Sequence, residues 1–166
     1  MPALPVLLYP DRRLKTVCDE VDDFEKASEI IGDLLDTMDA GPPRTVGIAA
    51  PQIGAMTRVA LVHTDRNPKY TGGNGFLAMI NPVIIEREGE QYFREGCLSI
   101  PDYTANIQRA AKIKVAFFDT RGEQFILNSE GFESVVIQHE LDHLDGILFL
   151  DRVHNIKTDL FRRRQQ

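Results

Sequence analysis

The sequence predicts an α+β fold with mostly antiparallel strand pairing. Three observations lead to this class: an amphipathic helix near the start, several strand-like segments in the middle, and a second helix near the end that is apolar around most of its circumference. No strand–helix–strand unit repeats, so a parallel sheet is not expected. The 166 residues contain no internal repeat, low-complexity tract or long linker, and we expect residues 1–166 to form a single domain.

The first helix is expected from Phe24 to Met38, because its apolar residues recur at the spacing of one helical face. Gly41-Pro42-Pro43 ends it, since proline cannot continue a helix. Strands are expected at residues 58–63 and 76–85, and residues 112–118 and 124–127 are expected to form a hairpin around a short turn.

The second helix is expected from about Gly131 to Asp145, capped by Ser129 and ended by Gly146. On a helical wheel its apolar side chains leave only a narrow polar strip, which is typical of a central, buried helix. Three ionisable side chains nevertheless fall inside the apolar arc. Burying them is costly unless something compensates their charge, and a bound metal ion would do so.

These three side chains belong to an HExxH motif, His139-Glu140-Leu141-Asp142-His143. Residues four apart share a helix face, so both imidazoles can reach one metal ion while Glu140 stands beside its open coordination position. The alternative is a surface helix whose histidines pair with nearby acids, which the apolar flanks disfavour. Glu133 also lies in the apolar arc. Its place in the first turn, where a negative charge interacts favourably with the helix dipole, is sufficient to explain an acidic residue there.

A catalytic site of this type needs a third protein ligand. The extended motif with a further histidine six residues on is excluded, because that position is Phe149, and no glutamate follows Glu140. Cys97 is the strongest candidate, since residues 94–101 look like a turn at the end of a strand, suited to presenting a thiolate. The remaining candidates are Cys18, His63, His154 and Asp151.

The composition excludes several classes of protein. The 19 Lys and Arg against 25 Asp and Glu give a net charge of −6, which argues against a nucleic-acid binder that acts through one large basic face. No apolar run is long enough to span a membrane, and the apolar residues 3–9 lack the features of a signal peptide. Two distant cysteines are too few for a disulfide framework, so a reducing, cytoplasmic setting is expected.

Three segments occur in order along the chain: Gly47-Ile48-Ala49-Ala50-Pro51-Gln52, Glu95-Gly96-Cys97-Leu98-Ser99 and Gln138-His139-Glu140-Leu141-Asp142-His143. Together they resemble the three signature motifs of the peptide deformylase family. The resemblance covers nearly the whole chain; Thr45 departs from the glycine that usually opens the first motif. It implies antiparallel β-sheets packed around the central helix that carries HExxH, in a bacterial cytoplasmic enzyme that removes the N-formyl group of newly made proteins.

The resemblance also implies a role for each matching residue. Cys97, His139 and His143 would bind one divalent metal ion, usually Fe²⁺, although Zn²⁺, Ni²⁺ and Co²⁺ suit the same donors. Glu140 would act as the general base and then as the acid that returns the proton to the leaving amine.

Two further residues would stabilise the oxyanion: the side chain of Gln52 and the backbone N–H of Leu98. Glu95 would be a structural partner close to the site. We also expect a hydrophobic pocket for the methionine side chain, formed at Gly47 of the first motif and by residues that share the helix face of His139. These helix residues are Phe132, Val135 and Val136.

The expected partners are N-formyl-methionyl nascent peptides, cleaved with release of formate; neither DNA nor a membrane is expected. Five cations between residues 152 and 166 oppose Asp159, and this basic tail predicts a weak contact with the ribosome. A solvated tail end is the alternative. The cations are Arg152, Lys157, Arg162, Arg163 and Arg164.

Two rival functions share part of the pattern. A metallopeptidase would have HExxH and a general base, but its usual third ligand is missing here. A module with a structural zinc would normally close the site with four protein ligands, and Glu140 would then have no purpose beside an open position.

Overall fold

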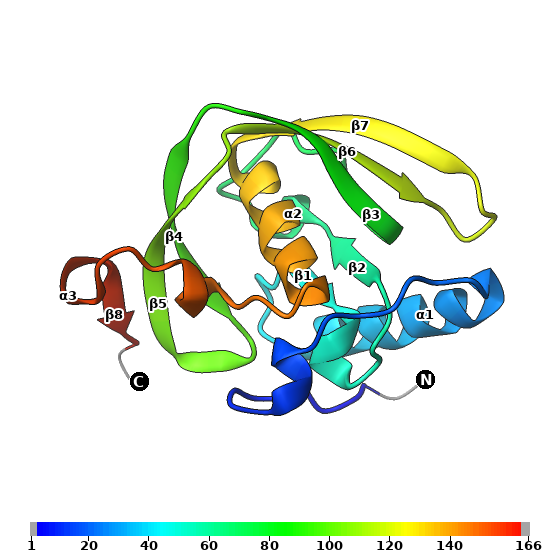
Figure 1. Cartoon of the computed structure of the whole chain (residues 1–166), viewed down its shortest axis with the longest axis horizontal. Helices are drawn as coiled ribbons and strands as arrows, with labels where there is room; N and C mark the ends of the chain where they lie inside the picture. Colours follow the sequence, from blue (N-terminus) through cyan, green and yellow to red (C-terminus); the bar gives the residue numbers. More distant parts are fainter. Residues whose placement is uncertain (1–2, 164–166) are drawn as a thin grey trace.

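Two antiparallel sheets surround a helix that is buried along nearly its whole length. The computed structural model describes residues 3–163. Figure 1 shows this helix, α2 (Gly131–Leu144), at the centre, with the larger sheet around one side and the curled smaller sheet on the other. The predicted α+β class, with antiparallel sheets around the HExxH helix, is confirmed.

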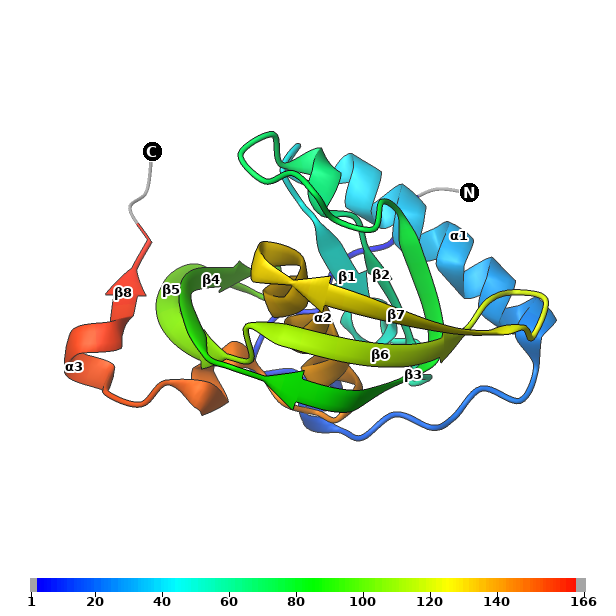
Figure 2. The same ribbon diagram turned by 90° about the horizontal axis from the view of Figure 1, so that it is seen from above.

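The larger sheet has five strands, and all its pairings are antiparallel. In spatial order they are β1 (Gly47–Ala49), β2 (Val59–Val62), β3 (Leu77–Glu88), β6 (Lys112–Phe118) and β7 (Gln124–Glu130). The smaller sheet has the order β4 (Gln91–Cys97), β5 (Ile100–Arg109) and β8 (Leu160–Arg162). In Figure 2, β8 lies beside β5 at the end of the molecule where the chain terminates.

The remaining elements are helical. The first, α1 (Phe24–Ala40), begins at Asp23, whose carboxylate accepts the backbone N–H of Lys26 at 3.1 Å and so caps the helix. The others are α3 (Ile156–Asp159) and four 3₁₀ helices, η1 (Arg12–Lys15), η2 (Ala50–Ile53), η3 (Thr64–Arg66) and η4 (Phe149–Arg152). No helix among residues 3–163 is long and apolar enough to cross a membrane.

Strand β2 separates two parts of the hydrophobic core, because side chains alternate between the faces of a strand. Val59 and Leu61 pack with the apolar face of α1, whereas Ala60 and Val62 pack with α2. All four are completely buried. The central helix is therefore held on the sheet by small and β-branched side chains, which let it approach closely.

The periodicity correctly predicted α1, β2, β3, β6, β7 and α2, with differences of at most three residues at their ends. The predicted cap of α2 by Ser129 is wrong. Ser129 belongs to β7 and its hydroxyl donates to Glu133 at 2.7 Å, while Glu130 precedes the helix without a side-chain cap. The Glu133 carboxylate also accepts hydrogen bonds from Asn74, and this anchors the loop before β3 to the first turn of α2.

Candidate metal centre and active site

The turn between β4 and β5 brings a cysteine to two histidines of α2. The ligand atoms of Cys97, His139 and His143 all lie within 4.8 Å of one another. Cys97 Sγ is 3.4 Å from Nε2 of His143, and the two imidazole centroids are 5.1 Å apart. One thiolate and two imidazoles on rigid elements form a donor set suited to a divalent transition metal, with further coordination positions open.

The other candidate third ligands do not join this group within residues 3–163. Burial raises the pKa of Cys18 to about 11, and its backbone N–H donates to Leu144 near the end of α2. The Asp151 carboxylate pairs with Lys15 instead. His63 lies against Phe76, with ring centroids 5.8 Å apart. The geometry therefore singles out Cys97.

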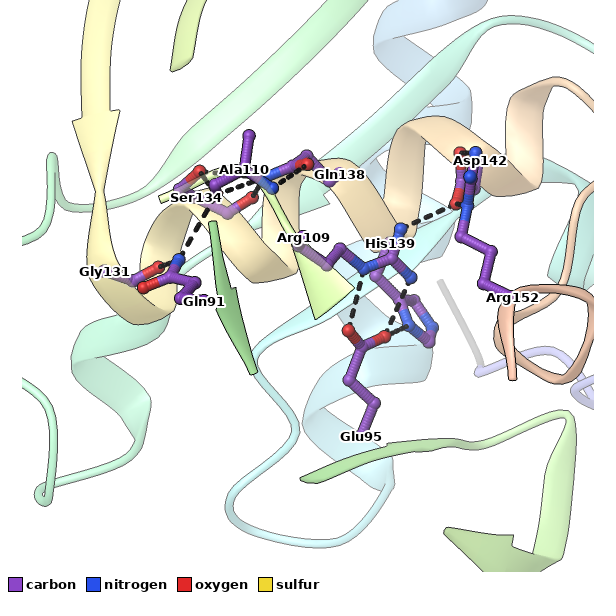
Figure 3. Close-up of polar contacts among 10 residues, drawn as sticks. All are labelled: Gln91, Glu95, Arg109, Ala110, Gly131, Ser134, Gln138, His139, Asp142 and Arg152. Carbon is purple, nitrogen blue, oxygen red and sulfur yellow. Dashed lines mark hydrogen bonds and ion pairs between the residues drawn. The ribbon is translucent and has the colours of Figure 1, made fainter. Parts of the chain in front are cut away.

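A buried carboxylate orients the first imidazole. Glu95 accepts two hydrogen bonds from Arg109, at 2.7 and 2.8 Å, and its Oε1 is 2.9 Å from Nδ1 of His139 (Figure 3). This contact keeps the proton on Nδ1, which leaves Nε2 free to bind a metal. Burial alone would raise the pKa of Glu95, but the hydrogen bonds from Arg109 and His139 lower it to about 2.

The same arginine continues into a second ion pair beneath α2. Arg109 Nη1 donates to Asp142 at 2.7 Å, and Arg152 donates to the same carboxylate at 2.5 and 2.9 Å. Figure 3 shows the resulting chain of charges running from Glu95 to Arg152 along one side of the helix. No sequence pattern links these residues, since Arg109 ends a strand that the periodicity did not predict.

Glu140 is buried against the ligands without a partner for one of its oxygens. Its Oε1 and Nδ1 of His143 are the buried side-chain polar atoms of residues 3–163 that lack a hydrogen bond. Such atoms are rare in native proteins and mark places where a ligand or solvent belongs. Burial raises the pKa of Glu140 to about 7, against the opposing charge of His139. A carboxylate with that pKa can both accept and return a proton near neutral pH.

The electrostatics of the two histidines fit a bound cation. Burial and the neighbouring charge of His139 lower the pKa of His143 well below its usual value, so its imidazole is neutral. Burial also opposes charge on His139, but hydrogen bonds with Cys97 and Glu95 outweigh it and raise that pKa. A neutral His143 has a ring nitrogen free to bind a metal ion, and a bound cation would take the place of the proton that Cys97 and Glu95 favour on His139.

The two predicted oxyanion donors lie beside the candidate ligand Cys97 and line the same cavity. Gln52 is held in η2, where its Oε1 accepts the backbone N–H of Ala49 at 2.9 Å. Its Nε2 is thereby turned inward, 3.1 Å from Ser99 Oγ and 3.6 Å from Cys97 Sγ. Leu98 follows Cys97 in the turn and lines the same cavity.

That cavity has a volume of about 420 Å³ and contains the predicted pocket residues. Phe132, Val135 and Val136 line it together with Gly47, where an added Cβ would lie 2.6 Å from Oε2 of Glu140. Phe132 stacks on Tyr70 with ring centroids 3.7 Å apart, an aromatic contact that sequence reasoning missed because Tyr70 lies in a turn-rich loop.

The basic tail is divided between different environments. Arg152 belongs to the ion pair with Asp142, and Arg163 lines the cavity of the candidate site. Lys157 and Arg162 are exposed. Arg164 lies outside the described residues.

Comparison with known proteins agrees with this geometry. Residues 3–159 match the family model described as polypeptide deformylase. A peptide deformylase of Xylella fastidiosa is 40% identical over 99% of this chain and 95% of its own length. The chain belongs to the peptide deformylase family. It is thus a metal-dependent hydrolase that removes the N-formyl group from nascent peptides.

Solved structures of peptide deformylases share the fold. A crystal structure of a peptide deformylase from Legionella pneumophila has a TM-score of 0.82 and 36% identity, covering 93% of this chain and 88% of that one. The Met-Ala-Ser-bound peptide deformylase of Acinetobacter baumannii has a TM-score of 0.83 and 33% identity, covering 91% and 98% of the two chains. The family is metal-dependent, and in this member Cys97, His139 and His143 form a group that could hold a metal ion.

Proposed function

We propose that Cys97, His139 and His143 hold one divalent metal ion and that Glu140 moves the proton of the deformylation reaction. The observation that carries this proposal is the buried Glu140, with one oxygen unpaired and a pKa near 7, beside three converging ligand atoms. The ion, when bound, supplies Lewis-acid polarisation of the reacting oxygens. Fe²⁺ is proposed as the ion in the cell, because most members of this family use it; Zn²⁺, Ni²⁺ and Co²⁺ suit the same donors.

The protein's own groups divide the remaining work. Glu140 takes a proton from the attacking water and returns it to the leaving amine, so that formate and a free N-terminus are released. Gln52 Nε2 and the Leu98 N–H donate to the oxygen that becomes negative in the transition state. Glu95 holds His139 in the tautomer that leaves Nε2 unprotonated.

The substrate proposed is an N-formyl-methionyl peptide in the bacterial cytoplasm. Two facts support it: the relatives compared come from bacteria, and the Acinetobacter baumannii peptide deformylase was crystallised with Met-Ala-Ser, an unformylated peptide. The direct test measures formate release from formyl-Met-Ala-Ser and new amino termini from acetyl-Met-Ala-Ser and unblocked Met-Ala-Ser. We expect formate from the formyl peptide alone, whereas cleavage of Met-Ala-Ser itself would indicate a peptidase.

The methionine side chain is proposed to enter the cavity beside Val136. This residue is 6% exposed and lies one turn before Glu140, so its side chain can set the depth of the pocket. Val136→Phe should fill the pocket and lower the preference for formyl-Met over formyl-Ala peptides by about tenfold, since a few methylene groups are at stake. Unchanged selectivity in a folded variant would contradict the pocket.

A weak contact with the ribosome is proposed for the exposed cations of the tail, Lys157 and Arg162. Their charge and exposure support this contact, while Arg152 is engaged elsewhere. Co-sedimentation with ribosomes should fall when both are replaced by glutamine and when salt is raised. Co-sedimentation that is insensitive to both changes would contradict the contact.

A further inference from the structure

Three arginines line the same cavity as the metal ligands. Arg44, Arg94 and Arg163 are all exposed, and within the chain from residue 3 to 163 none of them pairs with a carboxylate. The acidic residues of the cavity wall are Glu95 and Glu140, which are buried and already have roles in the site. The mouth of the cavity therefore carries uncompensated positive charge, although the protein as a whole has a charge of −6.

Arg163 reaches the cavity because the end of the chain is fixed to the smaller sheet. Strand β8 pairs with β5, with Arg162 opposite Tyr103, and the backbone N–H of Arg163 donates to Asp102 at 2.7 Å. The guanidinium then lies over Gly96, where an added methyl group would overlap it. Because Gly96 directly precedes Cys97, this cation lies at the edge of the metal centre.

The same strand holds the second arginine in place. The Arg94 guanidinium is 3.6 Å from the ring centroid of Phe161, and its Nε donates to Asn106 at 3.1 Å. Arg94 nevertheless remains exposed to solvent. Arg44 lies on the loop before β1, among the other lining residues of the cavity. Two of the three cations are thus pre-positioned by the C-terminal strand.

We propose that Arg44, Arg94 and Arg163 form a cationic rim that selects nascent chains with an acidic residue shortly after the formyl-methionine. This inference rests on the proposed function and deepens it, since it concerns which peptides the same site prefers. An extended peptide advances about 3.3 Å per residue, so the second to fourth residues of a substrate remain within about 15 Å of the reacting group. Guanidinium groups bind carboxylates in a planar, two-point geometry, which matches Asp and Glu side chains.

The rim should influence selectivity only through charges on the substrate that come close to the three arginines. Charges farther away than a Debye length of about 8 Å at physiological salt are largely screened, so the distant excess of acids does not cancel the rim. An exposed ion pair of this kind changes affinity about two- to fivefold. The effect should appear in KM, because the rim lies away from the atoms that react.

The test compares formyl-Met peptides that carry Glu, Gln or Lys in turn at positions two, three and four. In wild type, kcat/KM at one or more of these positions should follow the order Glu, Gln, Lys, with a span of about fivefold or more that shrinks in 0.5 M salt. Arg163→Gln and Arg44→Gln should each reduce this span, and Arg163→Lys should retain only part of it, because an ammonium group keeps the charge but lacks the two-point geometry. Arg121→Gln is the matched control, since it removes one exposed cation from the distant turn between β6 and β7.

The outcomes separate this inference from the function itself. If wild type hydrolyses the Gln peptides but treats Glu and Lys alike at every position, the rim has no role. A preference for Glu that survives in both glutamine variants also overturns the assignment. If wild type releases no formate from the neutral peptides, the proposed function fails and the rim fails with it. A loss of selectivity in Arg121→Gln equal to that in Arg163→Gln would show a general charge effect and contradict a local rim.

Discussion

At the scale of single residues, Glu95 and Arg109 combine deep burial with ionic pairing. Glu95 is 6% exposed and Arg109 is 5% exposed, yet each meets opposite charge at hydrogen-bond distance. A buried pair of this kind adds little net stability compared with apolar residues, but removing one partner leaves a charge without compensation. Its value here is positional, because the same Glu95 oxygen that contacts Arg109 also fixes His139.

Glu95→Gln should therefore destabilise the protein, in a way that depends on pH. The pKa of Glu95 is about 2 in the folded protein and about 4.5 when the side chain makes no such contacts, as in the unfolded chain. Its ionised form therefore stabilises the fold fully above pH 4.5. That contribution is lost as the pH falls from 4.5 toward 2. Urea unfolding should show a loss of about 3 kcal/mol in the variant at pH 7, shrinking below pH 4.5.

Glu86→Gln provides the control for this comparison. Glu86 is an exposed carboxylate whose nearest cation, Lys114, is 3.6 Å away. Its loss should change the free energy of unfolding by less than about 0.5 kcal/mol. If Glu95→Gln is as stable as Glu86→Gln at pH 7, leaving Arg109 without the Glu95 charge does not destabilise the fold, and the prediction is wrong.

At the scale of elements, α2 ends at Leu144, one residue after the candidate ligand His143. Gly146 provides this end with a φ of 71°, in the left-handed region that favours glycine. A Cβ there would also lie 2.7 Å from the backbone carbon of Lys15, so the N-terminal segment packs directly on the turn. The sequence predicted the glycine's role as a helix stop but not this close contact.

Gly146→Ala should therefore cost more than an ordinary glycine replacement. Gly122 offers a matched comparison, because its φ is 79° but no atom lies within 4 Å of an added Cβ. Gly122→Ala should lower the free energy of unfolding by about 1–2 kcal/mol through backbone strain alone. Gly146→Ala should lose at least about 1 kcal/mol more from overlap with Lys15. Equal losses in thermal or urea unfolding would contradict the close packing at the helix end.

The elements that the sequence predicted are those whose apolar residues follow one period. Strands β4 and β5 were not predicted, for two reasons. Pro101 and Asp102 look like a turn in the sequence, and the curled sheet buries charged residues such as Glu95 and Arg109, which breaks the apolar alternation. Strand β8 has only three residues, too few to show alternation. Its position depends on pairing with β5, which no local pattern contains.

The candidate site likewise contains residues that the sequence predicted and residues that it could not predict. Two ligands and the base lie within one helical turn, so HExxH alone predicted them, and Cys97 followed from its turn-like surroundings. The partners of Asp142 could not be predicted, because Arg109 and Arg152 reach it from separate elements. The place of Arg163 at the cavity likewise depends on how the end of the chain docks.

For the whole molecule, a metal ion at this site would join the two sheets. Cys97 belongs to the smaller sheet, whereas His139 and His143 lie on the helix that packs on the larger sheet. Binding to the folded state alone stabilises it by about 2.7 kcal/mol at a free metal concentration of 100 times Kd. Removal of the ion should thus weaken the connection between the sheets.

Chelation should lower the Tm of the metal-loaded protein by about 5–10 °C, given about 2–4 °C per kcal/mol for a chain of this size. Differential scanning calorimetry with and without chelator measures this shift. His139→Ala, which lacks a ligand, should show no dependence on chelator. An unchanged Tm in wild type after the ion has been removed, as checked by elemental analysis, would contradict a structural link through the metal.

The central claim is that Glu140 moves the proton at a metal centre formed by other residues. The measurement that tests it most directly is the metal content and kcat of Glu140→Gln with formyl-Met-Ala-Ser, beside those of His139→Ala. Glutamine keeps the size of the side chain but cannot accept a proton, so kcat should fall by about 10²- to 10⁴-fold while metal stays near one ion per chain. His139→Ala should lose metal and activity together. A Glu140→Gln enzyme that retains its metal and turns over within a few-fold of wild type would contradict the account.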